Sequence, residues 1–221
     1  VCVLPPVESR PYIDITRDVM ASFGVYVEEE RENRFHIPGG QRYGSRAATV
    51  EGDWSNAAFL MALGDGVEVT GLRDNSLQGD RVCREMLRRL REPGAVLDLA
   101  PCPDLGPILF AAVARGHGAV FTGTRRLRIK ESDRVAAMAQ ELAKFGVRVQ
   151  AEENRVTVLP GGITAPTEEL DGHNDHRIVM ALSVLAASAG GTISGAEAVN
   201  KSYPDFFDAL RTLGLTIEIR S

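Results

Sequence analysis

A run of cations with two carboxylates, residues 125–134, stands directly before an apolar helical pattern. Ser132 is a good N-cap for that helix, and Gly146 is placed to end it. The first turn of a helix attracts anions through its free N–H groups and its dipole, and Lys130 and Arg134 add fixed charge there. The segment therefore predicts an anion-binding helix entrance, although a charge run alone is more often a solvated basic face.

Two further cations lie where other helices are predicted to begin. Arg177 stands one step into an apolar helix and needs an anionic partner, because an unpaired buried charge is very costly. That partner is either a neighbouring Asp or the carboxylate of a ligand. Lys201 precedes Ser202, which can cap the last helix, and Pro204 suits its first turn. Together, these helix entrances predict a pocket for a small polyanion carrying phosphate and carboxylate.

Carboxylates accompany these cations. Asp53, Asp104 and Asp175 stand at equivalent positions before apolar helices, and an N-cap role explains all three. Asp104 lies between two prolines that fix the backbone, which suits a carboxylate held for proton transfer; the local sequence weights the two roles equally. Glu131 is the second titratable carboxylate beside the cations. The pattern predicts an enzyme site with an anion clamp, a general acid and a general base.

Composition limits the other functions. The chain has 221 residues, 44% of them hydrophobic, and a net charge of -5. This length suits one large or two modest domains. An acidic chain is a poor general nucleic-acid binder, so none is expected as a partner. No signal peptide is visible, and the longest apolar run, 178–187, is too short to span a bilayer.

Metal-binding and nucleophilic side chains are few. The three cysteines are odd in number, which argues against a disulfide scaffold and favours a reducing, cytoplasmic location. Cys102 is interpreted as a buried inert thiol, because no His follows at a diagnostic position. His173 and His176 lack the Cys or carboxylate cluster that would complete a metal site. Surface or supporting roles are therefore favoured for both, and no metal is expected.

Three parts of the chain resemble one another. Each opens with Asp, passes through an apolar helix and a Gly-containing turn, and ends in a short strand closed by Gly: 53–71, 104–123 and 175–195. An amphipathic helix and a second strand follow each time, the strands being 96–99, 147–149 and 215–219. A period of about 50–70 residues indicates a repeated supersecondary unit. The apolar helices should be buried and the amphipathic ones should cover sheets from outside, which predicts an α/β fold of three pseudo-symmetric units.

Residues 1–50 do not begin such a unit. A helix over 14–23 and strands near 24–27 and 35–40 match the second half of a unit, without its first half. We therefore expect the chain to begin inside a repeat, as a truncated protein or one polypeptide of a split one; a degenerate first repeat is the alternative. The apolar faces of this segment are then expected to be exposed and to favour association.

Several collinear segments, weak singly but highly specific together, resemble the 5-enolpyruvylshikimate-3-phosphate synthase family. They cover the chain from end to end: residues 9–14, 39–43, 50–53, 103–107, 127–134, 174–178 and 201–204. The resemblance implies transfer of the enolpyruvyl group of phosphoenolpyruvate to the 5-hydroxyl of shikimate-3-phosphate with release of phosphate, a step of aromatic amino acid biosynthesis. It also implies that no metal or organic cofactor is needed.

The resemblance also implies a role for each candidate residue. Asp104 would accept the proton of the attacking hydroxyl, and Glu131 would handle the proton at the methylene carbon of phosphoenolpyruvate. Arg134 and Arg177 would hold its carboxylate, and Lys201 its phosphate. The residues expected to touch shikimate-3-phosphate or to join the shared anion cluster are Ser9, Tyr12 and Lys130.

The family fold implied is an inverse α/β barrel: two domains, each of three βαβαββ-type units, closing on the substrates. Residues 1–50 resemble the tail of the shikimate-3-phosphate-side domain, and residues 51–221 the phosphoenolpyruvate-side domain of three pseudo-repeats. The family's N-terminal half, with further substrate-binding loops, has no counterpart here. Because positioning and charge stabilisation supply most of an enzyme's acceleration, we expect this chain alone to be inactive or nearly so, with that half as its partner.

Three other functions compete with this one. UDP-N-acetylglucosamine enolpyruvyl transferase shares the fold, but residues 127–134 and 174–178 favour the shikimate enzyme. A non-catalytic fragment could bind phosphoenolpyruvate weakly through Arg134, Arg177 and Lys201. An RNA-processing relative is disfavoured by the acidic net charge.

Overall fold

The computed structural model describes residues 1–5 and 7–220. The α-helices are α1 (Arg10–Ser22), α2 (Trp54–Met61), α3 (Cys83–Arg89), α4 (Gly106–Ala114), α5 (Arg134–Lys144), α6 (His176–Ala189) and α7 (Phe206–Thr212). The strands are β1 (Glu28–Arg31), β2 (Arg34–His36), β3 (Val96–Asp98), β4 (Ala119–Thr122), β5 (Val149–Ala151), β6 (Arg155–Val158), β7 (Leu170–Asp171) and β8 (Ile193–Ser194). Short 3-10 helices are η1 (Gly79–Val82), η2 (Pro103–Leu105), η3 (Arg125–Ile129) and η4 (Ala196–Lys201).

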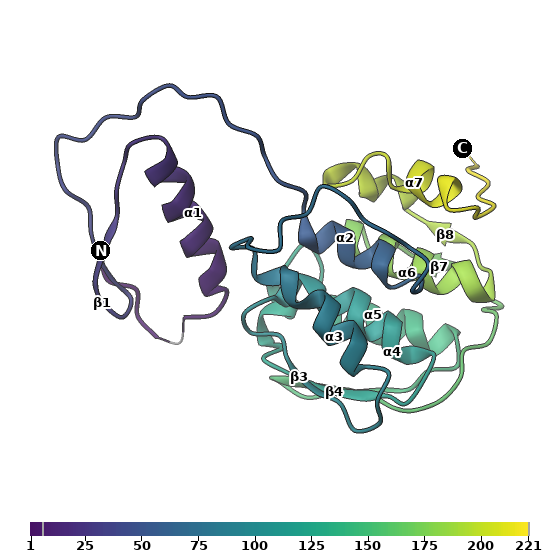
Figure 1. Cartoon of the computed structure of the whole chain (residues 1–221). Helices are drawn as coiled ribbons and strands as arrows, with labels where there is room; N and C mark the ends of the chain where they lie inside the picture. Colours follow the sequence, from purple (N-terminus) through teal and green to yellow (C-terminus); the bar gives the residue numbers. More distant parts are fainter. Residues whose placement is uncertain (6, 221) are drawn as a thin grey trace.

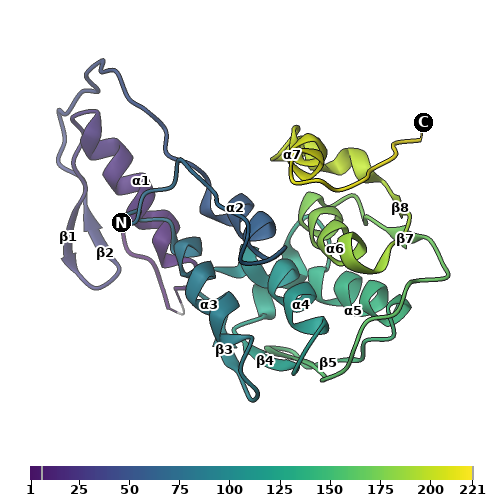
Figure 2. The same ribbon diagram turned by 45° about the vertical axis from the view of Figure 1, so that its right-hand side comes forward.

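Two sheets and a layer of helices form the larger part of the molecule. The four-stranded sheet has the order β3-β4-β6-β5, in which β3 runs parallel to β4 and the other neighbours are antiparallel. Strands β7 and β8 form a second, parallel pair. Helices α4 and α6 pack against each other, and they lie between the four-stranded sheet and α7 (Figures 1 and 2).

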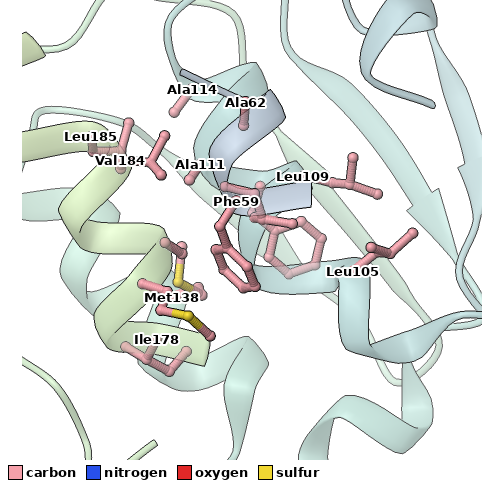
Figure 3. Close-up of a cluster of buried hydrophobic side chains, with 14 of the residues drawn as sticks. Phe59, Ala62, Leu105, Leu109, Ala111, Ala114, Met138, Ile178, Val184 and Leu185 are labelled. Carbon is pink, nitrogen blue, oxygen red and sulfur yellow. The ribbon is translucent and has the colours of Figure 1, made fainter. Parts of the chain in front are cut away.

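The apolar helices of the repeats are buried, as their sequences predict. Every residue of α4 except Ala112 is buried, and so are the first ten residues of α6. Figure 3 shows part of the buried core, in which Met138 of α5 and Ile178 of α6 lie beside Phe59 of α2. Burial of this apolar surface is the main stabilising contribution to the fold.

The repeat pattern predicts the strands less completely. Strands form at β3, β4 and β8 as expected, and β5 begins at the last residue of its predicted range. The predicted strands at 67–70 and 215–219 are wrong, because neither segment is a strand in the structure. A strand is defined by its hydrogen-bonded neighbour, and neither segment has one among the described residues.

Of the three Asp residues at equivalent positions, two cap helices and one does not. The carboxylate of Asp53 accepts from the N–H groups of Ser55 and Asn56, and that of Asp175 accepts from Arg177 N. Asp104 caps no helix; it lies within η2, where its carboxylate is available for other partners. The N-cap interpretation is therefore correct for Asp53 and Asp175 and wrong for Asp104.

Two predicted helix starts need correction. Asp133, not Ser132, caps α5, because its carboxylate accepts from the N–H groups at 135 and 136. Helix α7 begins only at Phe206, so Ser202 and Pro204 lie before it. Lys201 consequently ends η4 instead of entering α7, and Lys130 likewise follows directly on η3.

The first part of the chain folds as a helix beside a hairpin. Phe35 of β2 is buried beneath the guanidinium groups of Arg10 and Arg17, 5.5 and 5.3 Å from its ring centre, and both arginines pair with Glu29. Helix α1 has no buried residue, but Val25 after it is buried and Ile13, Met20 and Phe23 are half-buried, so the expected exposure of the apolar side chains holds only in part. A long stretch without helix or strand joins the hairpin to α2 (Figure 1). The domain boundary between residues 50 and 51 stays a prediction.

No helix within the described residues is long and apolar enough to cross a bilayer.

Candidate active site

Arg134, the first residue of α5, is the centre of a buried network of charges. Its side chain is 1% exposed. Nε donates to Asp175 Oδ2 at 2.8 Å, Nη1 to Asp104 Oδ1 at 2.8 Å, and Nη2 to Glu131 Oε2 at 2.5 Å. Burial opposes ionisation of the guanidinium, but the hydrogen bond to Asp175 and the three negative charges outweigh it and raise the pKa of Arg134. The three carboxylates explain why this cation can be buried.

Asp104 is surrounded by positive charge. Besides Arg134, its carboxylate lies 3.1 Å from Lys130 Nζ and 3.4 Å from Arg177 Nη2, and it accepts from the Tyr12 hydroxyl at 2.7 Å. Burial alone would raise the pKa of this carboxyl. The cations and the Tyr12 hydroxyl reverse that effect and hold the pKa of Asp104 far below its usual range. Its neighbours thus hold the Asp104 carboxylate in place, while its role in proton transfer stays a prediction.

Arg177, at the second position of α6, reaches across to another repeat. Its Nη1 donates to Ser55 Oγ at 2.8 Å and to the backbone oxygen of Asp104 at 3.4 Å, in addition to the ion pair with that residue's carboxylate. The partner of Arg177 is thus an Asp from a different segment of the chain. The neighbouring Asp175 accepts a hydrogen bond from the backbone N–H of Arg177, at 2.9 Å.

A cavity of about 440 Å³ opens beside Asp104. Ser9 stands at its edge in a left-handed conformation (φ 57°), and its buried hydroxyl has no hydrogen-bond partner among the described residues. Such strain in a residue that is not glycine is typical of functional sites. The residues that line the cavity are Val3, Val7, Glu8, Ser9, Tyr12, Ile13, Asp104, Arg126 and Lys130.

Most of the predicted site residues meet, and one stands aside. Ion pairs or hydrogen bonds join Tyr12, Asp104, Lys130, Glu131, Arg134 and Arg177, and Ser9 lines the same cavity. Lys201 instead donates to the backbone oxygen and to Oδ1 of Asn174, the latter at 2.7 Å. Asn174, the residue that precedes Asp175, therefore links Lys201 to the network.

The cations and carboxylates of this network balance. Its three cations, Lys130, Arg134 and Arg177, face three carboxylates, Asp104, Glu131 and Asp175. The network itself therefore has no excess positive charge with which to hold an anion. An anionic ligand must share these cations with the carboxylates, and Lys201 and Arg126 are the nearby cations that can favour it.

Sequence reasoning missed three members of the site. Asp175 was recognised only as an N-cap, yet its fully buried carboxylate also binds Arg134 and the Ser132 hydroxyl. Arg126 lines the cavity, although the sequence presents it as one more cation in a basic run. Asp80 of η1 is buried near Asp104, and no local pattern signals the burial.

Two of the less reactive candidates are clarified as well. Cys102 is buried, and burial raises the pKa of its thiol to about 12, which confirms an inert residue. His176 is buried too, so a surface role is wrong for it, and burial lowers the pKa of its ring. No group of three potential ligands is placed to hold a metal ion within residues 1–5 and 7–220.

The buried Asp80 carboxyl should oppose folding as the pH rises. Burial, and then the charge of Asp104, raise its pKa from 3.8 to about 7, so the folded state keeps a proton that the unfolded chain loses above pH 3.8. Asp80→Asn should therefore be no more stable than the parent below about pH 4 and up to ~4 kcal/mol more stable above about pH 7. Urea unfolding at pH 5 and pH 8 measures this difference; an equal gain at both values would contradict it.

The fold places this chain among the enolpyruvyl transferases. The solved structure of the enolpyruvyl transferase NikO from Streptomyces tendae matches 97% of the chain with a TM-score of 0.68; at 16% identity it shows the fold alone. EPSP synthase from Acinetobacter baumannii matches 93% of the chain with a TM-score of 0.80 and 25% identity. These matches confirm the predicted α/β class.

The sequence comparisons identify the family. The family model described as EPSP synthase (3-phosphoshikimate 1-carboxyvinyltransferase) matches residues 2–210, and the chain belongs to this family. The 3-phosphoshikimate 1-carboxyvinyltransferase of Clostridium kluyveri is 36% identical over 96% of the chain, and that of Methanoregula boonei is 37% identical over 91%. The chain spans about half the length of the curated relatives it matches, 54% and 53% of these two.

Proposed function

We propose that this chain supplies the phosphoenolpyruvate side of an active site that transfers an enolpyruvyl group to the 5-hydroxyl of shikimate-3-phosphate. The observation that carries the proposal is the network around Asp104, in which a carboxylate and the predicted anion-binding cations share one buried site beside a cavity. Family membership gives the reaction class. A second polypeptide corresponding to the other half of the relatives would supply the remaining shikimate-3-phosphate contacts.

In the proposed reaction, the 5-hydroxyl adds to the central carbon of phosphoenolpyruvate while Asp104 takes its proton. Glu131 donates a proton to the methylene carbon, which becomes a methyl group in a tetrahedral intermediate. Phosphate then leaves, a methyl proton returns to a carboxylate, and the enol ether is formed. Arg134 and Arg177 would bind the carboxylate of phosphoenolpyruvate and Lys201 its phosphate, while Ser9, Tyr12 and Lys130 would face shikimate-3-phosphate.

The surroundings of Asp104 connect substrate binding with this proton transfer. A carboxylate whose pKa is held far below the usual range is a weak base. An anion that binds Lys130, Arg134 or Arg177 shares the positive charge that stabilises ionised Asp104. The pKa of Asp104 then rises toward its ordinary value, so the base is strengthened only when the anionic substrates are bound.

The proposal is tested by phosphate release from phosphoenolpyruvate plus shikimate-3-phosphate. The chain is assayed alone and then with the N-terminal half of a family member supplied separately. We expect turnover only with both polypeptides, because half of a preorganised site cannot position both substrates. Saturable turnover by the chain alone would refute the expected inactivity, and silence in both assays would favour a non-catalytic fragment. Offering UDP-N-acetylglucosamine as the acceptor tests the alternative transferase.

Two matched variants show whether the activity uses the assigned site. Glu131 pairs with Arg134 three residues later, and Glu85 pairs with Arg88 at the same spacing on the exposed surface of α3. Glu131→Gln should lower turnover by about 10²-fold or more, since a proton donor in the transition state is lost. Glu85→Gln should leave it unchanged. Equal effects would remove Glu131 from the proposed mechanism. The cytoplasmic location and the cofactor-free reaction stay predictions.

A further inference from the structure

The loop that leads into α6 has an unusual backbone. His173 and Asn174, two consecutive residues that are not glycine, both have left-handed conformations, with φ of 50° and 49°. Such residues persist only where their surroundings hold them, because the conformation costs free energy. Asp175 and Arg177, which belong to the charge network, lie one and three residues after Asn174. Asn174 itself contacts Lys201. The shape of the loop therefore decides where three site residues lie.

A buried carboxylate on α5 holds this loop. The side chain of Glu141 is 0% exposed. Its Oε2 accepts from Asp171 N at 2.9 Å and from Lys144 Nζ at 2.8 Å, and its Oε1 lies 3.1 Å from His173 Nε2. Asp171 Oδ1 in turn accepts from His173 N at 2.7 Å. Glu141 thus fixes both the start of the loop and the side chain of its first left-handed residue.

The same helix contacts the loop at a second point. Arg134, at the start of α5, binds Asp175, and Glu141 follows two turns later on the same buried face. The loop is therefore attached to α5 both before and after its left-handed residues. Gly172 lies between the two points of attachment, Asp171 and Asp175. There is no room for a side chain at this position, since a Cβ would lie 2.6 Å from Val179 Cγ2 and 2.7 Å from Ser194 O.

We infer that Glu141 is a positioning residue of the proposed active site, acting through Asp171 and His173 to place Asp175, Arg177 and Lys201. The inference rests on the proposed function, because it assigns the loop to the phosphoenolpyruvate side. Glu141 itself does not contact the network around Asp104 in the described structure. Its loss should therefore weaken phosphoenolpyruvate binding while leaving the contacts of Ser9 and Tyr12 with the cavity intact.

Glu141→Gln tests this assignment with the full chain. Glutamine keeps the size of the side chain but carries no negative charge for Lys144 and presents an amide group to neighbours that donate. We expect the dissociation constant for phosphoenolpyruvate, measured by calorimetry, to rise about tenfold, the effect of roughly one charged hydrogen bond. Amide hydrogen exchange at Asp171 and Arg177 should also become faster, because their hydrogen bonds hold the loop.

Two further variants separate positioning from general destabilisation. Val158→Ala removes buried methyl groups from β6, away from the loop, and should lower the melting temperature without changing the affinity. His173→Asn keeps a residue that tolerates the left-handed conformation but removes the ring that contacts Glu141, so it should repeat the effect of Glu141→Gln. In the double variant the two effects should not add.

The readouts distinguish failure of this inference from failure of the proposed function. If the parent chain does not bind phosphoenolpyruvate, the proposed ligand is wrong, and loop exchange still decides whether Glu141 positions the loop. Parent-like affinity and parent-like exchange in both Glu141→Gln and His173→Asn would overturn the inference. The same would follow if Val158→Ala reduced affinity as much as Glu141→Gln does.

Discussion

Replacing Arg134 by methionine should lower the free energy of unfolding by about 3–5 kcal/mol, because it leaves the buried carboxylate of Asp175 without its cation. The fully buried Asp175 loses its ion pair, and Asp104 and Glu131 each lose one. Methionine has a similar volume, so a cavity contributes little to the loss. Urea unfolding at neutral pH measures the effect, and calorimetry with phosphoenolpyruvate measures the expected loss of binding in the variant that remains folded.

Two controls make the Arg134 result specific. Arg88→Met breaks a solvent-exposed ion pair with Glu85 and should leave the free energy of unfolding almost unchanged. Arg134→Lys retains the charge but places it on one nitrogen, whereas the guanidinium reaches the three carboxylates from three separate nitrogens, so the stability of this variant should lie between those of the parent and the methionine variant. A loss below about 1 kcal/mol for Arg134→Met would contradict the view that this guanidinium holds the site together.

Asp104→Asn should reduce turnover of the complemented enzyme by about 10²–10⁴-fold, the range typical for loss of a general base. The asparagine can still accept a hydrogen bond from Tyr12, but it cannot take the proton of the attacking hydroxyl. Phosphate release measures the effect. Asp98→Asn is the matched control, because Asp98 accepts hydrogen bonds from Ala100 N and Thr122 Oγ1 outside the network. Equal turnover of both variants would remove Asp104 from the proposed mechanism.

The same substitution has a defined pH dependence. The folded-state pKa of Asp104 lies far below its usual range, so its ionisation stabilises the folded state. This contribution is complete above the unfolded-state pKa, about 4, and is lost as the pH falls below it toward the folded-state pKa. The stability gap between parent and Asp104→Asn should therefore narrow as the pH falls below about 4. A gap that widens on acidification below pH 4 would contradict the assigned direction.

Local sequence pattern predicted the elements whose cause is local. The apolar composition of α4 and α6 required burial, and both are buried. The caps at Asp53 and Asp175 depend on residues two or three positions away, so they could be predicted as well. The strands at 67–70 and 215–219 could not be judged in this way, because a strand depends on a distant partner that composition does not reveal.

The sequence predicted which residues belong to the site better than it predicted their contacts. Motif positions pointed to Asp104, Arg134 and Arg177, and both arginines contact Asp104 in the structure. The sequence did not reveal that Asp175 closes the network, since one carboxylate serves there as both a cap and an ion-pair partner. The partner of Lys201 was also unpredictable, because it depends on the left-handed conformation of Asn174.

The balance of charge in the network limits how this site can change during evolution. Arg134 is shared among Asp104, Glu131 and Asp175, so replacing it leaves the buried charge of Asp175 unpaired. A neutral replacement at position 134 is tolerable only if position 175 becomes neutral as well. We therefore expect substitutions at 104, 134 and 175 to be correlated across descendants of this chain, whereas the exposed pair of Glu85 and Arg88 is free to vary independently.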